Sequence, residues 1–415
     1  MTKKIITPQT LKGFRDFLPA EKKQRDFVMG KIKQTFELFG FEPLETPTLE
    51  YSELILGKYG KEADKMVYSF KDKGGRNLSL RYDQTVPTAR VLAQYQNILP
   101  KCFRRYQLQN VFRADKPQKG RYREFTQCDI DIFGSTSPLA DAEIIACTYF
   151  SFKNVGYPNI ILRLNDRQIL FDILSPYATK QLPALSIIQT IDKLDKKTET
   201  DVLKELISKG LTAKLAKQAL QDINQAKTSD NLKQIINLSQ DLGVPKESLK
   251  FSPFLARGLD YYTGMIFEVV LPEYKLGSFG GGGRYDNLIK QLGGLDIPAV
   301  GIAFGFDRMT EAAITLKLIP TADIGTKVLL TTFPETVKLS ARTTQQFRQV
   351  GIATEIYPGE EKIDKQLKYA NKKGIPYVII IGPDEAAKNL VTLKDMTTGK
   401  QETLILQQAI DVLAR

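Results

Sequence analysis

The chain contains no histidine and no tryptophan among its 415 residues, and it has only three cysteines. The absence of histidine excludes the Ser-His-Asp triad, the Cys-His pair and zinc sites with histidine ligands. Any catalysis therefore has to rest on arginine, lysine, carboxylate, tyrosine and backbone groups. These groups favour the electrostatic stabilisation of anions over the shuttling of protons.

The three cysteines, Cys102, Cys128 and Cys147, are scattered and form no CxxC pair. We interpret them as reduced structural thiols, which is typical of a cytoplasmic protein. No apolar run approaches the length of a membrane span, and no signal-peptide core follows Met1–Lys4. We therefore expect a cytoplasmic protein that is not embedded in a membrane.

Lysine and arginine together number 59 and aspartate and glutamate 47, which gives a formal net charge of +12. Two interpretations stay open: the charge keeps the protein soluble, or it attracts a polyanion, nucleic acid first. The chain has no basic tail, so the excess of cations lies on folded surfaces. Charge by itself does not separate DNA from RNA or from a nucleotide.

The first third of the chain predicts one helix and a β-rich region. Glu21–Phe39 is amphipathic, whereas Phe41–Leu49 carries two prolines and belongs at a sheet edge or an interface. Gln107–Arg113 and Phe125–Phe133 look like two strands joined by the long charged loop 114–124. This arrangement predicts an antiparallel pair of strands with a charged connection.

The remainder predicts a helical stretch and then a second domain. Residues 171–250 are rich in Leu, Ile, Lys and Gln and indicate a helical insertion. Met265–Leu271 and Ala299–Gly305 are predicted strands, and a helix begins near Phe306. From Lys327 onward strands and helices alternate, which indicates βαβ units and a largely parallel sheet in a separate domain.

Several arginines stand where predicted strands meet loops or helices. Arginine is planar, forked and permanently charged, so it fits phosphate oxygens, although any single one could equally form a surface ion pair. These arginines are Arg113, Arg121, Arg123, Arg257 and Arg308.

The glycine run Gly280–Gly283 lacks the endings of a P-loop and the spacing of a dinucleotide fold. It predicts either a tight turn or bulge, or a close approach of the backbone to a ligand. Gln127, Asp129 and Asp131 alternate along one predicted strand, so they share a face. That face is either exposed to solvent or the floor of a polar pocket.

Ordered motifs along nearly the whole chain resemble those of a known enzyme family. Phe112–Gln127, with its Arg113 and its Gly-Arg-Tyr-Arg-Glu-Phe segment, resembles motif 2 of class II aminoacyl-tRNA synthetases, and Gly301–Arg308 resembles motif 3. The region of Pro47 resembles motif 1, which belongs to the dimer interface in that class. Arg257–Gly264 and Gly281–Asp286 resemble signatures of histidyl-tRNA synthetases and their close paralogues.

The resemblance implies an α+β catalytic domain built on an antiparallel sheet over residues 1–170 and 251–320. A helical insertion domain would span 171–250, and a C-terminal α/β anticodon-binding domain 326–415. The implied activity joins histidine to ATP, releases pyrophosphate and then transfers the histidyl group to the 3' end of tRNA. The family further implies a homodimer and ATP that arrives with Mg²⁺, and we assign no protein side chain to the metal.

The resemblance also assigns roles to residues. Arg113 and Arg257 match the catalytic positions that face the α-phosphate. ATP-binding positions are matched by Arg113, Arg121, Phe125 and Arg308. Histidine-binding positions are matched by Asp83, Thr85, Gln127, Asp131, Tyr261 and Tyr262.

The chain departs from the family pattern at four positions. Ala114 stands where many members carry histidine or a basic residue, and Thr126 where histidine is frequent. The acidic residues Asp83 and Asp131 are shorter than the glutamates that are common there. The departure at Thr126 places in doubt any scheme that uses an imidazole as a proton relay in the transfer step.

Two other functions are compatible with parts of this pattern. A catalytically silent paralogue, the regulatory subunit of ATP phosphoribosyltransferase, shares the tyrosine motif and the fold. That paralogue tends to lose the detail of motif 2 and the anticodon domain, and both are present here. A synthetase-like sensor domain of a kinase would be accompanied by kinase motifs, which this chain lacks.

Overall fold

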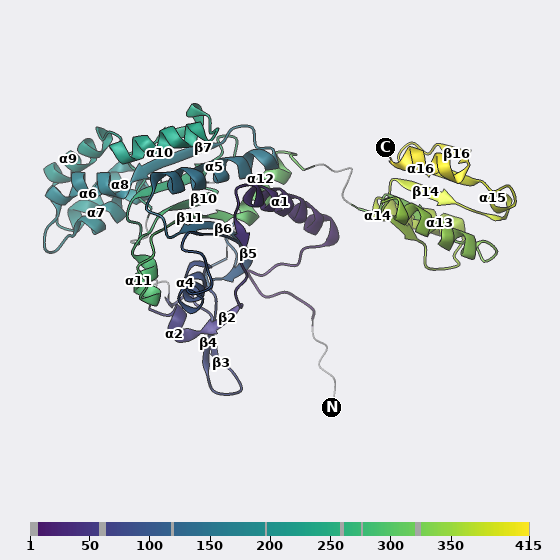
Figure 1. The fold of residues 1–415 in the computed structure, drawn as a ribbon, viewed down its shortest axis with the longest axis horizontal. Coiled ribbons are helices and arrows are strands. Elements are labelled where there is room, and N and C mark those ends of the chain that lie inside the picture. The colour runs from purple at the N-terminus through teal and green to yellow at the C-terminus, as the bar shows by residue number, and fades with distance from the viewer. Residues whose placement is uncertain are drawn as a thin grey trace. The chain divides into compact units, whose positions relative to one another are not determined.

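The computed structural model describes residues 7–57, 64–117, 120–195, 197–257, 261–274, 277–319 and 325–414. The chain forms two compact units, Met1–Ile319 and Pro320–Arg415 (Figure 1). None of the described helices is both long enough and apolar enough to cross a membrane.

An eight-stranded sheet forms the centre of the first unit, in the order β1-β5-β6-β11-β10-β9-β7-β8. Its interior neighbours are all antiparallel, and only the edge pairs β1–β5 and β7–β8 are parallel. The antiparallel sheet expected from the sequence is therefore confirmed. The strands are β1 (Glu42–Pro43), β5 (Phe103–Phe112), β6 (Glu124–Phe133), β11 (Ala299–Gly305), β10 (Gly280–Arg284), β9 (Met265–Val270), β7 (Ile161–Asp166) and β8 (Leu249–Phe251).

Three helices cover one face of this sheet: α1 (Pro19–Leu38), α5 (Pro138–Val155) and α12 (Phe306–Thr315) (Figure 1). The predicted amphipathic helix is α1, and it buries its apolar side, including Phe36, which has no exposed surface. The ring of Phe36 lies 5.7 Å from the rings of both Tyr106 and Phe304. Since alternate strand residues face these helices, the residues between them face the opposite side, where the polar groups gather.

The predicted strand pair is β5 and β6, which are antiparallel as expected. Their register pairs Arg105 with Asp131 and Gln109 with Gln127, so the polar residues of the two strands share one face. Pro43 lies on the edge strand β1, in agreement with the interpretation of the proline-containing segment.

The glycine run forms β10, a strand in the middle of the sheet, so the prediction of a tight turn or bulge is wrong. A Cβ on Gly282 would lie 2.1 Å from the carbonyl oxygen of Gly301, and one on Gly283 would lie 2.4 Å from that of Met265. Only glycine fits where neighbouring strands approach so closely. The sequence misleads here because glycine weakens a strand unless such an approach requires it.

A second, three-stranded sheet of the first unit has the order β2-β4-β3 and is antiparallel throughout (Figure 1). The elements of this region are β2 (Leu49–Tyr51), α2 (Ser52–Ile55), β3 (Ser69–Lys71), β4 (Asn77–Leu80), α4 (Thr85–Gln94) and, later in the chain, α11 (Leu288–Gly293).

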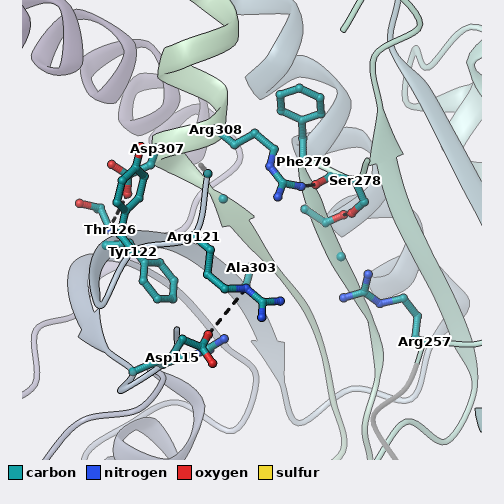
Figure 2. Close-up of a pocket in the computed structure, with 16 residues that line it drawn as sticks. Asp115, Arg121, Tyr122, Thr126, Arg257, Ser278, Phe279, Ala303, Asp307 and Arg308 are labelled. Carbon is teal, nitrogen blue, oxygen red and sulfur yellow. Dashed lines mark hydrogen bonds and ion pairs between the residues drawn. The ribbon is translucent and has the colours of Figure 1, made fainter. Parts of the chain in front are cut away.

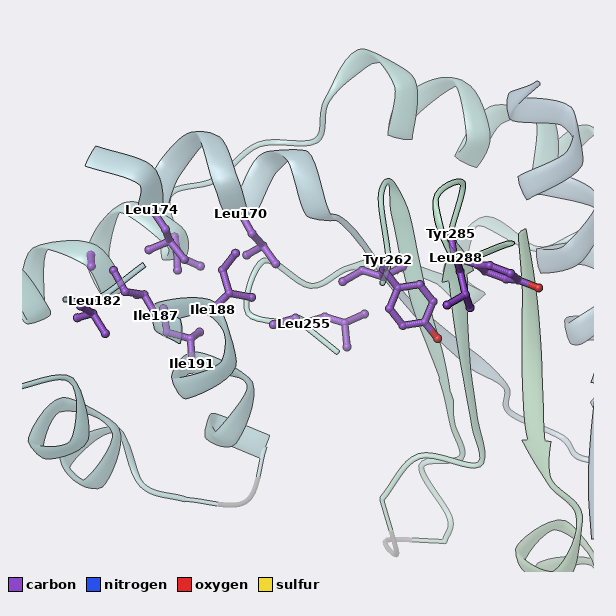
Figure 3. Packing of buried hydrophobic residues seen from close by; sticks show 14 of the residues in the cluster. Leu170, Leu174, Leu182, Ile187, Ile188, Ile191, Leu255, Tyr262, Tyr285 and Leu288 are labelled. Atoms are coloured by element: carbon purple, nitrogen blue, oxygen red, sulfur yellow. The ribbon is translucent and has the colours of Figure 1, made fainter. Parts of the chain in front are cut away.

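The described residues between β7 and β8 are helical, as the composition predicted. The α-helices are α6 (Arg167–Leu174), α7 (Ala184–Ile191), α8 (Glu199–Ser208), α9 (Ala213–Asn224) and α10 (Asp230–Asp241). Side-chain oxygens of Thr198, Thr212 and Ser229 accept backbone hydrogen bonds at the starts of α8, α9 and α10. The apolar sides of α6, α7, α8 and α9 join a buried cluster that reaches the sheet at Tyr262 and Tyr285 (Figure 3).

The second unit contains a five-stranded sheet in the order β13-β12-β14-β15-β16. The first three of these strands are parallel, whereas β15 and β16 form an antiparallel hairpin that the sequence analysis missed. The sheet is therefore mixed rather than largely parallel. Its elements are β12 (Val328–Leu330), α13 (Val337–Gln349), β13 (Thr354–Ile356), α14 (Ile363–Lys373), β14 (Tyr377–Ile380), α15 (Pro383–Ala387), β15 (Val391–Asp395), β16 (Gln401–Leu404) and α16 (Leu406–Ala414).

Two glycine-to-alanine variants should have opposite effects on stability. Gly282→Ala forces a methyl group into the neighbouring backbone, so it should lower the free energy of unfolding by at least about 1–3 kcal/mol. Gly30 lies inside α1 with nothing within 4 Å of an added Cβ, so Gly30→Ala should raise it by up to about 1 kcal/mol. Urea unfolding curves measure both. A Gly282→Ala variant as stable as the wild type would contradict the close packing of β10.

Candidate active site

A pocket of about 290 Å³ opens on the polar side of the large sheet. Its walls come from the loop between β5 and β6, the start of β6, the strand β10 with the residues before it, the end of β11 and the start of α12 (Figure 2). It is lined by Arg113, Asp115, Gly120, Arg121, Tyr122, Phe125, Thr126, Arg257, Ser278, Phe279, Gly280, Gly281, Ala303, Gly305, Asp307 and Arg308.

The pocket is positively charged, because four arginines and only two carboxylates line it. All the residues predicted for ATP and for the α-phosphate are among these lining residues. Arg121 and Arg257 lie on opposite sides with their guanidinium groups turned toward each other (Figure 2). Permanent cations around a hollow of this size make it suited to a polyanionic ligand.

Arg257 lies flat against the glycine strand. A Cβ on Gly281 would lie 2.1 Å from the guanidinium carbon of Arg257, so glycine is required there for the arginine to occupy this place. The Nη1 atom lies 3.8 Å from an oxygen of Glu268, and the buried Nε–H has no hydrogen-bond partner among the described residues. Arg257 also has a φ of 50°, an uncommon conformation for a side chain of this size. Gly258, Leu259 and Asp260 of the same motif lie outside the described residues.

The end of β5 and the start of β6 supply the opposite wall. Arg113 donates from Nε to the carbonyl oxygen of Tyr82 at 3.1 Å, and its guanidinium lies 5.2 Å from the ring centre of Phe125. Arg121 is half-exposed, and its Nε lies 3.8 Å from a carboxylate oxygen of Asp115. Arg308 stands in the first turn of α12 and donates to the carbonyl oxygen of Ser278.

The six residues predicted to bind histidine do not line this pocket. Gln127, Asp129 and Asp131 follow the pocket residue Thr126 along β6, and they are only 8%, 3% and 5% exposed. The solvent-facing interpretation of this strand is therefore wrong. Burial of three polar groups in a row requires partners, which the neighbouring strands supply only in part.

Asp131 is held from two sides. Its Oδ1 accepts a hydrogen bond from the hydroxyl of Tyr285, and its Oδ2 lies 2.7 Å from Nη2 of Arg105. The second contact is too poorly aligned for a hydrogen bond, so we treat it as an ion pair. A Cβ on Gly301 would lie 1.8 Å from Asp131 Oδ1, which shows why β11 has glycine opposite this carboxylate.

Gln127 has an unsatisfied acceptor. Its amide nitrogen donates to Asp129 at 3.4 Å, while its buried Oε1 has no hydrogen-bond partner in the described part of the chain. Asp83 accepts from the backbone nitrogen of Val86 at 3.2 Å, at the start of α4, where Thr85 is the first residue. A buried amide oxygen without a donor is unfavourable by itself and is suited to a ligand that brings an N–H group.

Tyrosine hydroxyls complete the buried polar floor that Gln127, Asp129 and Asp131 form beside the pocket. The rings of Tyr261 and Tyr262 are 4.6 Å apart, and that of Tyr285 is 5.9 Å from Tyr261. Burial raises the pKa of Tyr261 and of Tyr285 well above the ordinary value, so both keep their protons. Their hydroxyl groups can therefore donate hydrogen bonds as well as accept them.

Sequence reasoning missed two residues of this floor, Arg105 and Tyr285, and it placed Asp129 on the same face as Gln127 and Asp131 without giving it a binding role. Tyr285 lies within the Gly281–Asp286 motif, which was the available signal for it. The position of Arg105 follows only from the register of β5 against β6, which no sequence pattern defines.

Burial also changes the acidity of the floor carboxylates. It raises the pKa of Asp129 well above the ordinary value, against the opposing effect of Arg105. It raises the pKa of Asp131 as well, where Arg105 and the Tyr285 hydroxyl oppose it. The protonated form of Asp129 is therefore favoured in the folded protein.

An Asp129→Asn variant should become more stable than the wild type as the pH rises. The folded state disfavours ionised Asp129, whereas the unfolded chain ionises it near pH 4, so the wild type loses stability from there up through the raised pKa. We expect the variant's melting temperature to exceed that of the wild type by roughly 3 °C or more at pH 8, with a smaller difference at pH 5. Asp26→Asn, on the exposed side of α1, is the control. A constant difference at all pH values would contradict the assignment.

Comparison with protein families gives two matches that together span most of the chain. Residues 13–309 match the family described as histidyl-tRNA synthetase, and residues 327–415 match the anticodon binding domain.

Individual relatives agree with these matches. The chain is 37% identical to a histidine–tRNA ligase of Wolinella succinogenes, over 99% of this chain and 98% of that one. It is also 37% identical to a histidine–tRNA ligase of Clostridium tetani, over 100% and 99%. Among solved structures, the histidyl-tRNA synthetase of Nostoc sp. PCC 7120 superimposes with a TM-score of 0.87 at 29% identity, covering 99% of this chain and all of that one. The chain belongs to the histidyl-tRNA synthetase family.

Proposed function

We propose that this protein is a histidine–tRNA ligase, which activates histidine with ATP and transfers the histidyl group to the 3' end of its tRNA. The observation that carries the proposal is the junction of two sites: an arginine-lined pocket and, next to it along β6, a buried floor of carboxylate, amide and tyrosine groups. The first is suited to a polyphosphate and the second to a small polar amino acid.

In the activation step the carboxylate of histidine attacks the α-phosphate of ATP, and pyrophosphate leaves. Negative charge develops on the α-phosphate oxygens in the transition state, so preorganised cations lower the barrier. We assign this role to Arg113 and Arg257. The unsatisfied Nε–H of Arg257 supports the assignment, since a phosphate oxygen would supply the missing acceptor.

The rest of ATP is distributed over the same pocket. Adenine stacks on Phe125, with Arg308 on its other face, because a π-face accepts both a ring and a guanidinium. Arg121 contacts the outer phosphates from its half-exposed position on the loop. No cluster of three or more metal-binding side chains is found among the described residues, and Mg²⁺ is proposed to arrive with the phosphates of ATP and water as its ligands.

The substrate histidine lies on the buried polar floor beside the pocket. Gln127 and Asp83 take its ammonium group, and the unpaired Oε1 of Gln127 supports this placement. Thr85 and Tyr261 complete this part of the site. Asp131 and Tyr262 read the two nitrogens of the imidazole ring, which are distinct because one donates and one accepts in the neutral ring.

The transfer step has no imidazole available to it. Thr126 occupies a position where histidine is frequent in the family, and Ala114 one where many members carry histidine or a basic residue. We therefore infer that the phosphate of the adenylate or a neighbouring side chain acts as base. The C-terminal unit, with 13 lysines and arginines against 10 aspartates and glutamates from Thr326 onward, is assigned to the anticodon of tRNA. Unpaired anticodon bases would be read splayed out from the RNA backbone.

We also propose a cytoplasmic homodimer. The cytoplasm is supported by the three cysteines, which are all free thiols. The dimer is supported by the small sheet β2-β4-β3, which follows the segment resembling motif 1. That sheet exposes the apolar side chains of Leu49, Tyr51 and Phe70, which are 41%, 54% and 46% exposed.

Amino-acid-dependent exchange of pyrophosphate into ATP tests the proposed activity. The purified protein is assayed with each of the twenty amino acids, and exchange is expected with histidine alone. Analogues that lack a ring nitrogen should react at least about 1,000-fold more slowly, because the floor would be left with unpaired polar groups. Absence of exchange with histidine would refute the activity and leave a regulatory paralogue as the alternative.

Arg257→Ala should lower the rate of this exchange by about 100- to 1,000-fold while histidine binding is retained. The control is Arg163→Ala, because Arg163 pairs with the same Glu268 at 3.4 Å and lies outside the pocket. Rates are measured in the exchange assay, and histidine binding is measured by calorimetry. A near-normal rate in the Arg257 variant would remove this residue from the proposed role.

Asp131→Asn should raise the KM for histidine by about 10- to 100-fold and leave the KM for ATP within about twofold. Both asparagine and alanine remove the charge opposite buried Arg105, but asparagine keeps the size of the side chain and an oxygen that can accept the hydrogen bond from Tyr285. Both constants are obtained from the exchange assay. Equal increases in the two would place Asp131 outside the imidazole site.

A further inference from the structure

The segment before α1, residues 12–17, lies against the loop between β5 and β6. The backbone nitrogen of Arg123 donates to the carbonyl oxygen of Gly13 at 2.9 Å, and Arg123 Nη1 donates to that of Lys12 at 3.3 Å. Gly13 has a φ of 92°, and an added Cβ would lie 2.8 Å from the side chain of Arg123. This N-terminal segment is thus fitted closely to the loop that supplies one wall of the pocket.

Arg15 is the side chain of this segment that reaches both sides of the pocket. Its guanidinium carbon lies 3.3 Å from the ring centre of Tyr122, on the loop, and its Nη2 lies 2.5 Å from Oδ1 of Asp307, in the first turn of α12. Tyr122 and Asp307 both line the pocket, whereas Arg15 does not.

Asp307 already has a second cation. The same oxygen accepts from Nη1 of Arg25 at 2.7 Å, and Oδ2 accepts from the backbone nitrogen of Thr126 at 3.1 Å. Thr126 follows Phe125 in the chain and Asp307 precedes Arg308, so this carboxylate ties together the two residues assigned to the faces of adenine.

The two arginines at Asp307 differ in their surroundings. Arg25 is 9% exposed and lies over the rings of Phe17 and Phe306, at 3.9 and 4.8 Å, within the packing of α1 and α12. Arg15 is 26% exposed and stacks on the loop. Since Arg25 suffices to neutralise Asp307, the distinct contribution of Arg15 is the connection from Asp307 to Tyr122.

We propose that Arg15 is a positioning residue for ATP: by holding Tyr122 and Asp307 together, it sets the separation between Phe125 and Arg308. The inference rests on the proposed adenine site and goes beyond it, because it assigns a role in ATP binding to a side chain that lies outside the pocket. The effect is expected on ATP and not on histidine, whose proposed partners lie on the floor behind Thr126.

Arg15→Gln and Arg15→Lys test this role. Glutamine loses the charge opposite Asp307 and the planar cation over Tyr122, so the KM for ATP and the Kd for ATP measured without histidine should both rise about 10-fold. Lysine keeps the charge but not the planar stack, and it should give an intermediate rise. The KM for histidine should stay within about twofold in both variants.

Lys22→Gln is the matched control. Lys22 pairs with Asp26 on the exposed side of α1, with both side chains more than half exposed, and the variant should have wild-type constants. Melting temperatures are measured for all variants. A fall in melting temperature with equal rises in the two KM values would show that Arg15 has only a structural role, and would overturn the proposal, as would unchanged ATP constants in Arg15→Gln.

A double-variant cycle with Tyr122→Leu tests the route of the effect. If Arg15 acts through Tyr122, the double variant should be no weaker for ATP than the weaker single variant. Multiplying effects would show that the two side chains act independently and would overturn the proposed connection. Binding of ATP alone is measured in the same proteins, so a failure of histidine-dependent exchange, which would refute the ligase activity, is distinguished from a failure of the Arg15 proposal.

Discussion

Glycines at one position on each of two neighbouring strands leave the space in which two charged groups of the site lie. Gly281 on β10 leaves space for the guanidinium of Arg257, and Gly301 on β11 leaves space for the carboxylate of Asp131. A methyl group at either position would occupy the place of the charged group itself. The surface of the sheet thus holds at fixed positions the cation that we propose faces the phosphate and the anion that we propose faces the amino acid.

The electrostatics of the site combine arginines, which keep their charge at neutral pH, with carboxylates whose pKa is raised by burial. Arginines line the pocket proposed for ATP, while the floor proposed for histidine contains two buried carboxylates, Asp129 and Asp131, and one fully buried arginine, Arg105. Burial raises the pKa of Asp129 against the opposing effect of Arg105, and the neighbouring Asp131 adds to the rise, so the neutral form of Asp129 is more favoured in the folded protein than in the unfolded chain. A chain without histidine therefore performs the activation step with permanently charged side chains. This suits a reaction whose barrier depends mainly on stabilising negative charge on phosphate.

Much of the fold could be predicted because its signals are local. The periodicity of α1, the alternation of β5 and β6 and the buried strand β11 all appear directly in the residues. The wrong prediction for the glycine run depended on neighbouring strands elsewhere in the chain, whereas the missed hairpin of β15 and β16 is local. The glycine run reads as a turn until its neighbours Gly301 and Met265 are known, and the hairpin of β15 and β16 changes a parallel sheet into a mixed one.

The sequence by itself determined the family, the absence of imidazole chemistry and the residue types available for phosphate and for a polar ring. Those properties are carried by composition and by motifs whose residues are near one another in the chain. The tertiary structure decided which of these residues meet: the register of β5 against β6 brought Arg105 to Asp131, and the packing of the N-terminal segment brought Arg15 to Tyr122 and Asp307. Contacts of this kind join residues separated by up to 292 positions, and only the folded backbone fixes the distances between them.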